Sequence, residues 1–135
     1  MNILFFTIQK HKVVYACDTM NVKEVYDLLE DNHYTAIPIL NKEGIYIGTI
    51  TEGDILRFLM SNEIKRTEVE KVKITDVTRL RDLEAINTDA KINDLILKAS
   101  NQNFVPVVDE AGAFIGIVTR KEIINYFFEH NFIVL

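Results

Sequence analysis

The sequence contains little of what marks several classes of protein. Its 135 residues include one cysteine, two prolines, five glycines and no tryptophan. So few glycines and prolines exclude a collagen-like or low-complexity chain. The one cysteine, Cys17, cannot form an internal disulfide, which is typical of a protein that works in a reducing compartment.

Positive charge and long apolar runs are also scarce. Fifteen Lys and Arg residues face twenty Asp and Glu, and the net charge of −5 argues against a surface that neutralises nucleic-acid phosphates. No run approaches the roughly 18 apolar residues of a membrane span, and the opening run Ile3–Ile8 lacks the basic leader of a signal peptide. We therefore expect an acidic, cytoplasmic globular protein that binds neither nucleic acid nor membrane.

Motifs for metal binding and catalysis are missing as well. His11, His33 and His130 share no metal-ligand spacing, and there is no Cys-x-x-Cys pair. Phosphate-binding loops and nucleophile motifs are also absent from the sequence. We expect no metal site, no cofactor and no catalytic residue, and hence a protein that is not an enzyme.

What the sequence does contain is an internal repeat. The segments Ala36–Thr51 and Phe104–Thr119 align without a gap, and their prolines differ by 106 − 38 = 68 positions. Five pairs of identical residues share this offset: Pro38 and Pro106, Gly44 and Gly112, Ile47 and Ile115, Gly48 and Gly116, Thr51 and Thr119. The two halves are therefore interpreted as copies of one structural unit.

Each copy begins with the same two predicted elements. A short β-rich run, Val13–Ala16 or Leu83–Ile86, precedes apolar residues that recur at helical spacing. Thr19 or Asn21 in the first copy, and Asp89 in the second, are the predicted N-caps of these helices.

The second part of each copy predicts a hairpin and a helix. Two apolar strands are separated by a short polar turn that ends in glycine. A final helix then opens near Thr51 or Thr119. The predicted order is strand, helix, strand, strand, helix, which makes the fold class mixed, α+β or α/β.

The repeat also sets the expected domain boundaries. The first copy takes residues 1–62, a connector takes 63–73, the second copy takes 74–130, and 131–135 form a tail. The stretch Ser61–Lys73 is mostly charged and lacks proline and glycine, which favours an exposed helical connector. Because a unit of about sixty residues is marginally stable alone, we expect the copies to share a core.

This arrangement resembles a tandem pair of CBS domains, the Bateman module, from about Lys12 to Phe128. The resemblance implies two β-α-β-β-α repeats packed with pseudo-twofold symmetry into one module. It further implies that an adenosine-containing ligand binds in the cleft between the repeats, and that the module signals to another protein without catalysing a reaction.

The resemblance assigns a first ligand site to the first copy. It implies that Asp54 holds the ribose hydroxyls, that Thr51 approaches the ribose or a phosphate, and that Tyr34, Thr35 and Ala36 contact the adenine. The chemistry is reasonable, because one carboxylate can accept hydrogen bonds from both vicinal hydroxyls.

A weaker second site is implied in the second copy. It would use Asn103, Phe104, Thr119 and Glu122, with glutamate where the family usually has aspartate. Arg120 is the predicted phosphate ligand, expected to serve the nucleotide held in the first site.

A helix cap is the alternative interpretation of both motifs. Thr119 and Glu122 fit a capping box with no ligand at all, whereas the shorter Asp54 fits that box with Thr51 less well. We therefore predict ribose binding for Asp54 and leave both interpretations open for Glu122.

The predicted function is that of an adenine-nucleotide sensor that binds an effector protein in trans. AMP, ADP, ATP, S-adenosylmethionine and cyclic di-AMP all remain possible ligands. A homodimer is expected by resemblance, through the apolar helix ends Leu56–Met60 and Tyr126–Phe128, with Phe132–Leu135 docked or in a dimer contact. The alternative function is a ligand-independent interaction and dimerisation module.

Overall fold

The computed structural model describes residues 2–130, which divide into two compact units. One unit spans Val14–Asp82, and we call it the first-repeat unit. The other, the second-repeat unit, combines the N-terminal segment up to Val13 with the chain from Leu83 onward. Each unit has its own buried apolar cluster.

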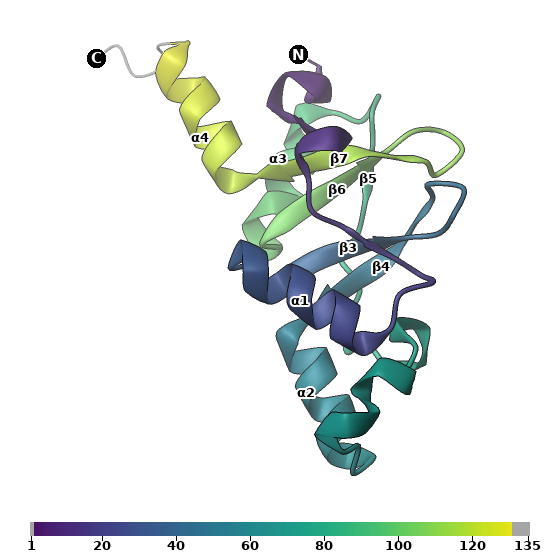
Figure 1. Ribbon diagram of the computed structural model, residues 1–135. Helices are drawn as coiled ribbons and strands as arrows, with labels where there is room; N and C mark the ends of the chain where they lie inside the picture. Colours follow the sequence, from purple (N-terminus) through teal and green to yellow (C-terminus); the bar gives the residue numbers. More distant parts are fainter. Residues whose placement is uncertain (1, 131–135) are drawn as a thin grey trace. The chain divides into compact units, whose positions relative to one another are not determined.

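The first-repeat unit contains a three-stranded sheet and two α-helices (Figure 1). Its elements are β2 (Ala16–Cys17), α1 (Val22–Asn32), β3 (Ala36–Leu40), β4 (Tyr46–Thr51), α2 (Glu52–Ser61), and the 3-10 helices η3 (Arg66–Lys71) and η4 (Ile74–Asp76). Strand β3 lies in the middle, parallel to β2 and antiparallel to β4.

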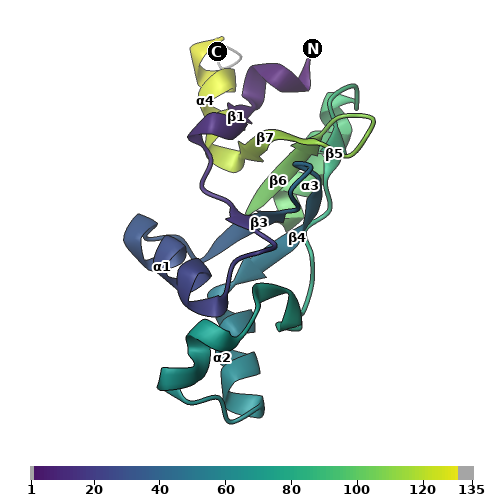
Figure 2. The ribbon, with the colours of Figure 1, turned by 45° about the vertical axis from the view of Figure 1, so that its right-hand side comes forward.

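The second-repeat unit repeats this plan and adds an N-terminal strand. Its elements are η1 (Ile3–Phe6), β1 (Ile8–Gln9), η2 (Lys10–Lys12), β5 (Ile86–Asn87), α3 (Ile92–Asn101), β6 (Phe104–Val108), β7 (Phe114–Thr119) and α4 (Arg120–Glu129). The sheet order is β1-β7-β6-β5, and Figure 2 shows β1 beside β7.

The predicted order of elements is confirmed in both repeats, and the fold is mixed α+β. The first strands begin later than predicted, at Ala16 and Ile86, and are only two residues long. In the first repeat the reason is local, because the Val13 N–H closes a 3-10 turn on the Lys10 carbonyl (3.0 Å) instead of entering a ladder.

One of the predicted helix caps is confirmed. Asn21 caps α1 and forms a complete capping box with Glu24. The prediction for Asp89 is wrong, since α3 starts later, at an N-cap position held by Lys91 with no side-chain hydrogen bond. The Asp89 N–H instead donates to the Asn87 side chain (3.2 Å), within the turn that precedes the helix.

The repeated prolines lie in strands β3 and β6, each the central one of its β-α-β-β unit. Strand β2 is in register only with Ile39 and Leu40. Pro38 therefore faces no strand on that side, and its lack of a backbone N–H costs no ladder hydrogen bond there. Pro106 is in the same situation, because β5 is in register only with Val107 and Val108.

The glycine turns are confirmed as hairpin turns. Gly44 and Gly112 have φ values of 80° and 85°, a region that L-residues with side chains rarely adopt. The side chains of Asn41 and Asp109 accept backbone N–H groups inside the two turns.

The N-terminal segment packs on the sheet of the second repeat. Ile3 and Phe6 are buried in that unit's apolar cluster, and Gln9 is in register with Gly116. A β-carbon at Gly116 would overlap the carbonyl oxygen of Ile8, so the close approach of β1 requires glycine there. The sequence analysis had placed this segment with the first copy.

The connector packs, in turn, on the first repeat. The predicted helical character is present, in 3-10 form, in η3, but Val69 and Val72 are only partly exposed. Ile74 and Val77, which the sequence analysis had placed in the second copy, are buried in the core of the first-repeat unit. They fill that core as Ile3 and Phe6 fill the core of the second-repeat unit. The segment that precedes each repeat therefore completes the core of the other repeat.

Two sequence-based expectations concern the ends of the chain and membranes. The tail 131–135 lies outside the described residues. Across residues 2–130, no helix combines the length and the apolar character needed to cross a bilayer.

Candidate functional site

Strand pairing in the first-repeat unit gathers most of the predicted first site. Ala36 on β3 is in register with Thr51 on β4, and the Glu52 N–H donates to the Thr35 carbonyl (3.0 Å). Helix α2 starts at this point and presents Asp54 in its first turn. The motif residues therefore lie where the edge of β3 meets the start of α2.

Thr51 and Asp54 form a complete capping box. Thr51 Oγ1 accepts the Asp54 N–H (3.0 Å), and Asp54 Oδ2 accepts the Thr51 N–H (3.1 Å). The expectation that aspartate fits this box less well is therefore wrong here. From the N3 position of α2 the aspartate side chain reaches the backbone N–H of the N-cap residue Thr51.

The Asp54 carboxylate has two further donors. Its Oδ1 accepts a hydrogen bond from Arg57 Nη2 (2.6 Å) and another from the Leu80 N–H (3.0 Å). The residue is only 1% exposed. Three of the four lone-pair positions of this carboxylate are thus occupied by the protein itself.

The chain around Leu80 is held against β4 by a second carboxylate. Asp82 Oδ1 accepts the Thr49 N–H (2.9 Å) and a hydrogen bond from Arg79 Nε (2.7 Å). These side chains lie over Gly48, where a β-carbon would approach Asp82 Oδ1 to 2.5 Å. Gly48 thus makes room for the segment Arg79–Asp82.

Tyr46 completes the polar contacts of β4. Its hydroxyl shares a hydrogen bond with Thr49 Oγ1 (2.6 Å). Burial raises the pKa of Tyr46 to about 12, since the phenolate would lose most of its hydration. The side chain therefore stays neutral at physiological pH and serves to hold Thr49.

The second-repeat unit brings its predicted residues together in the same way. Phe104 on β6 is in register with Thr119 on β7, directly after exposed Asn103. Thr119 Oγ1 accepts the Glu122 N–H at 3.3 Å, but within residues 2–130 the Glu122 carboxylate makes no hydrogen bond or ion pair. The cap of α4 is thus half of a capping box.

Arg120 holds the end of a helix in its own unit. Its Nε donates to the Ala99 carbonyl (2.6 Å) and its Nη2 to the Gln102 carbonyl (3.0 Å). Both acceptors lie at the C-terminal end of α3, where a cation is favourable. A phosphate role for Arg120 would add to, or replace, this structural role.

Gln102 lies beside the predicted second site, and the sequence analysis did not single it out. It is buried, and its side-chain amide donates to the carbonyls of Glu84 (3.0 Å) and Phe104 (3.2 Å). By the repeat offset it corresponds to Tyr34 (102 − 34 = 68), which is about half exposed. A polar residue two positions before an apolar strand was the one available signal.

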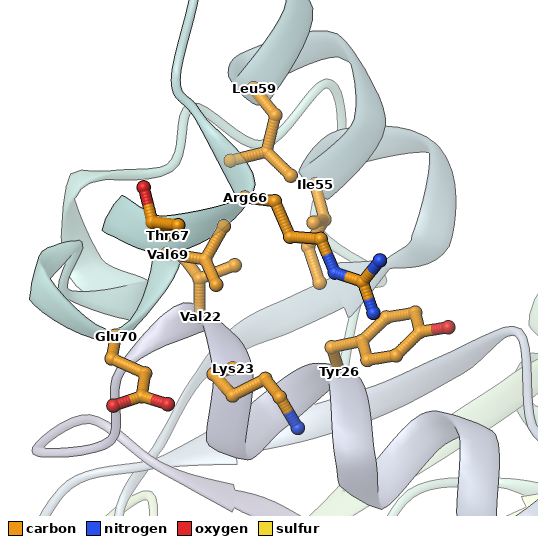
Figure 3. Close-up of a pocket in the computed structure, with 9 residues that line it drawn as sticks. All are labelled: Val22, Lys23, Tyr26, Ile55, Leu59, Arg66, Thr67, Val69 and Glu70. Carbon is orange, nitrogen blue, oxygen red and sulfur yellow. The ribbon is translucent and has the colours of Figure 1, made fainter.

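A separate groove of about 570 Å³ lies between α1, α2 and η3 (Figure 3). Its lining is largely apolar, with Arg66 and Lys23 among the polar groups: Val22, Lys23, Tyr26, Ile55, Leu59, Arg66, Thr67, Val69 and Glu70. Figure 3 shows the Arg66 side chain extending toward the Tyr26 ring. None of the predicted ligand residues lines it. Across residues 2–130, no cluster of His, Cys, Asp and Glu could hold a metal ion.

Comparison with known families identifies two domains in the chain. The sequence model of the CBS domain matches twice, at residues 7–61 and 74–129. The chain belongs to the CBS domain family. The resemblance noted from its repeated motif is thereby confirmed.

Several CBS proteins are similar along nearly the whole chain. The crystal structure of CbpB in complex with cyclic di-AMP has a TM-score of 0.90 at 28% identity, covering 98% of this chain and 89% of that one. Cyclic di-AMP receptor B of Bacillus subtilis is 28% identical over 93% of this chain and 85% of its own length. Listeria monocytogenes CbpB in complex with cyclic di-AMP has a TM-score of 0.80 at 25% identity, covering 92% of each chain.

Other CBS relatives are much longer than this chain. It spans 20% of homoserine O-acetyltransferase of Methanococcus vannielii, at 26% identity, and 21% of L-aspartate semialdehyde sulfurtransferase of Methanocaldococcus jannaschii, also at 26% identity. In such relatives the CBS pair is one part of a larger protein.

Proposed function

We propose that this CBS pair is a regulatory module that binds an adenine nucleotide and signals its presence to a partner protein. The observation that carries the proposal is the repeated gathering of a strand edge and a helix start. Ala36 is in register with Thr51 in one unit, and Phe104 with Thr119 in the other. Binding, not catalysis, is the role that these groups support.

The strand edge offers the chemistry for reading an adenine. Because β2 reaches only Ile39 and Leu40, no strand of the first-repeat unit pairs with the other edge of β3 at Ala36 and Ile37. Backbone N–H and C=O groups on such an edge can bond to the polar edge of a base.

Cyclic di-AMP is the ligand we propose to test first. Two of the structures most similar to this chain are CbpB complexes with that dinucleotide, and a curated relative is named as its receptor. The nucleotide carries two adenosines, and this chain carries two copies of the motif. AMP, ADP, ATP and S-adenosylmethionine are the competing candidates.

Thermal unfolding with and without these ligands tests the proposed function. At a hundred times its dissociation constant, a ligand adds about 2.7 kcal/mol of stability. We expect cyclic di-AMP to raise the melting temperature by about 8–16 °C, since 1 kcal/mol corresponds to about 3–6 °C for a domain of this size. Cyclic di-GMP, which lacks adenine, serves as the matched control and is expected to leave the melting temperature unchanged.

A ligand-independent interaction module is the second candidate. It is favoured by the Asp54 carboxylate, whose hydrogen bonds are supplied by the protein without a ligand. The absence of a thermal shift with all five adenine ligands would contradict the sensor and leave this second candidate.

We further propose that the module forms a homodimer through its helices. The final helix of each repeat exposes an apolar pair one turn apart, at equivalent positions: Leu56 and Met60 on α2, Ile124 and Phe128 on α4. In a twofold dimer, each subunit contributes the same surface to the interface. Exposed apolar pairs on the final helices are suitable for such a surface, because the contact would remove them from water.

Charge substitution on these helices tests the dimer. We expect Leu56→Asp with Met60→Asp to convert a dimer to a monomer in light scattering, because buried aspartates would lack partners. Leu97→Asp is the control, since Leu97 is exposed on α3 outside the repeated pairs. A parent protein that is monomeric at high concentration would contradict the proposal.

A further inference from the structure

The first motif carries an intramolecular contact that the second motif lacks. In the first-repeat unit, the backbone N–H of Leu80 donates to Asp54, the predicted ribose ligand (3.0 Å). In the second-repeat unit, the equivalent Glu122 receives no hydrogen bond from any residue between 2 and 130 on its carboxylate. The two copies of one motif therefore differ in whether their acid is already engaged.

A ribose and the protein would compete for the same oxygen atoms of Asp54. A vicinal diol needs two acceptor positions, and only one of the four on this carboxylate is free after the bonds to Thr51, Arg57 and Leu80. The carboxylate is also almost fully buried. A nucleotide can bind there only when at least one of these donors has left.

Leu80 belongs to a segment held mainly by polar contacts. Asp82 accepts the Thr49 N–H and pairs with Arg79, whose Nη2 also donates to the Ile47 carbonyl (3.4 Å). The Leu80 side chain is 78% exposed and is not packed in the apolar core, whereas Val77, three residues earlier, is buried. The segment Arg79–Asp82 can therefore lift from β4 while the chain stays anchored at Val77.

We propose that Arg79–Asp82 is an autoinhibitory strap that competes with the adenine nucleotide for the Asp54 carboxylate. The inference rests on the proposed function. The strap keeps the first motif closed. In the second-repeat unit, β1 lies over Gly116 but gives the Glu122 carboxylate no hydrogen bond, and the second motif is therefore filled first. Release of the strap opens the first motif and changes the path of the chain between the repeats, which gives a partner two states to distinguish.

Nucleotide titration of strap variants tests this inference. The background is the full chain with Thr119→Ala and Glu122→Ala, which removes the second motif, and the probe is cyclic di-AMP in calorimetry. Arg79→Ala with Asp82→Ala releases the strap. A strap closed nine-tenths of the time lowers the apparent affinity about tenfold, so we expect binding to tighten by about that factor or more.

The control removes an ion pair elsewhere in the same background. Glu84→Ala with Lys98→Ala deletes the 3.1 Å pair of the second-repeat unit and is expected to leave the affinity unchanged. Hydrogen exchange verifies release, because the amides of Leu80 and Thr49 lose protection only in the strap variant.

The outcomes separate the two proposals. Unchanged or weaker binding in the strap variant, with its amides exchanging freely, overturns the strap while the parent's binding upholds the proposed function. Tightening by the strap variant and not by the control supports the strap. If the parent protein binds none of the five adenine ligands, the proposed function fails and the strap fails with it.

Discussion

Phe6→Ala is expected to destabilise the protein by about 3–5 kcal/mol. Phe6 is 1% exposed, belongs to the apolar cluster of the second-repeat unit, and packs on Tyr126 with ring centroids 4.6 Å apart. Truncation removes this contact and leaves a cavity between η1 and α4. The free energy of unfolding, measured by urea titration, checks the prediction.

The neighbouring residue supplies the matched control. Phe5 has the same side chain but is 70% exposed, so Phe5→Ala is expected to change the free energy of unfolding by about 0.5 kcal/mol or less. Equal effects of the two substitutions would contradict the packing of the N-terminal segment on the second repeat. The comparison thus tests the assignment of residues 1–13 to that unit.

Asp54→Ala is expected to destabilise the protein by about 2–4 kcal/mol. The substitution removes the acceptor of the Thr51 and Leu80 N–H groups and the partner of Arg57. Arg57 itself is half exposed and keeps water, so the loss comes mainly from the two backbone donors. Urea unfolding without ligand measures this effect separately from nucleotide binding.

Glu122→Ala is the equivalent change in the second repeat. Its carboxylate has no protein partner within residues 2–130, so we expect a loss of less than about 1 kcal/mol. Similar losses at both positions would contradict the structural difference between the motifs. A loss at Asp54 alone would show that this acid stabilises the fold whether or not it binds a ligand.

Much of the fold was predictable because it is encoded by short-range patterns. The glycines at positions 44 and 112, the alternation of apolar residues and the helix caps act within a few residues, and the predicted order of elements is confirmed in both repeats. The two-residue strands β2 and β5 were misplaced, since so few residues carry no periodicity. Asn21 is the N-cap of α1, whereas Asp89 is not an N-cap, because helix α3 starts after Lys91.

The candidate site was predictable in position but not in hydrogen bonding. The repeat offset placed Thr51 and Thr119 at helix starts beside the strand edges, as found. The motif predicted that the Asp54 carboxylate accepts hydrogen bonds from a ligand, and it gave no sign of the donors that the protein itself supplies. It also gave no sign that Gln102 would be buried beside Phe104. Motif spacing specifies which residues are near each other, whereas the donors that reach them come from elsewhere in the chain.

The sequence by itself determined the repeat, the element order and the CBS family of this protein. Only the tertiary structure decided that residues up to Val13 complete the second repeat's core, and that Leu80 donates to Asp54 across 26 positions of sequence. Local conformation follows from turn chemistry and periodicity, which are legible in a few residues. Contacts between distant segments follow from which surfaces exclude water together, and that is settled only when the whole unit packs.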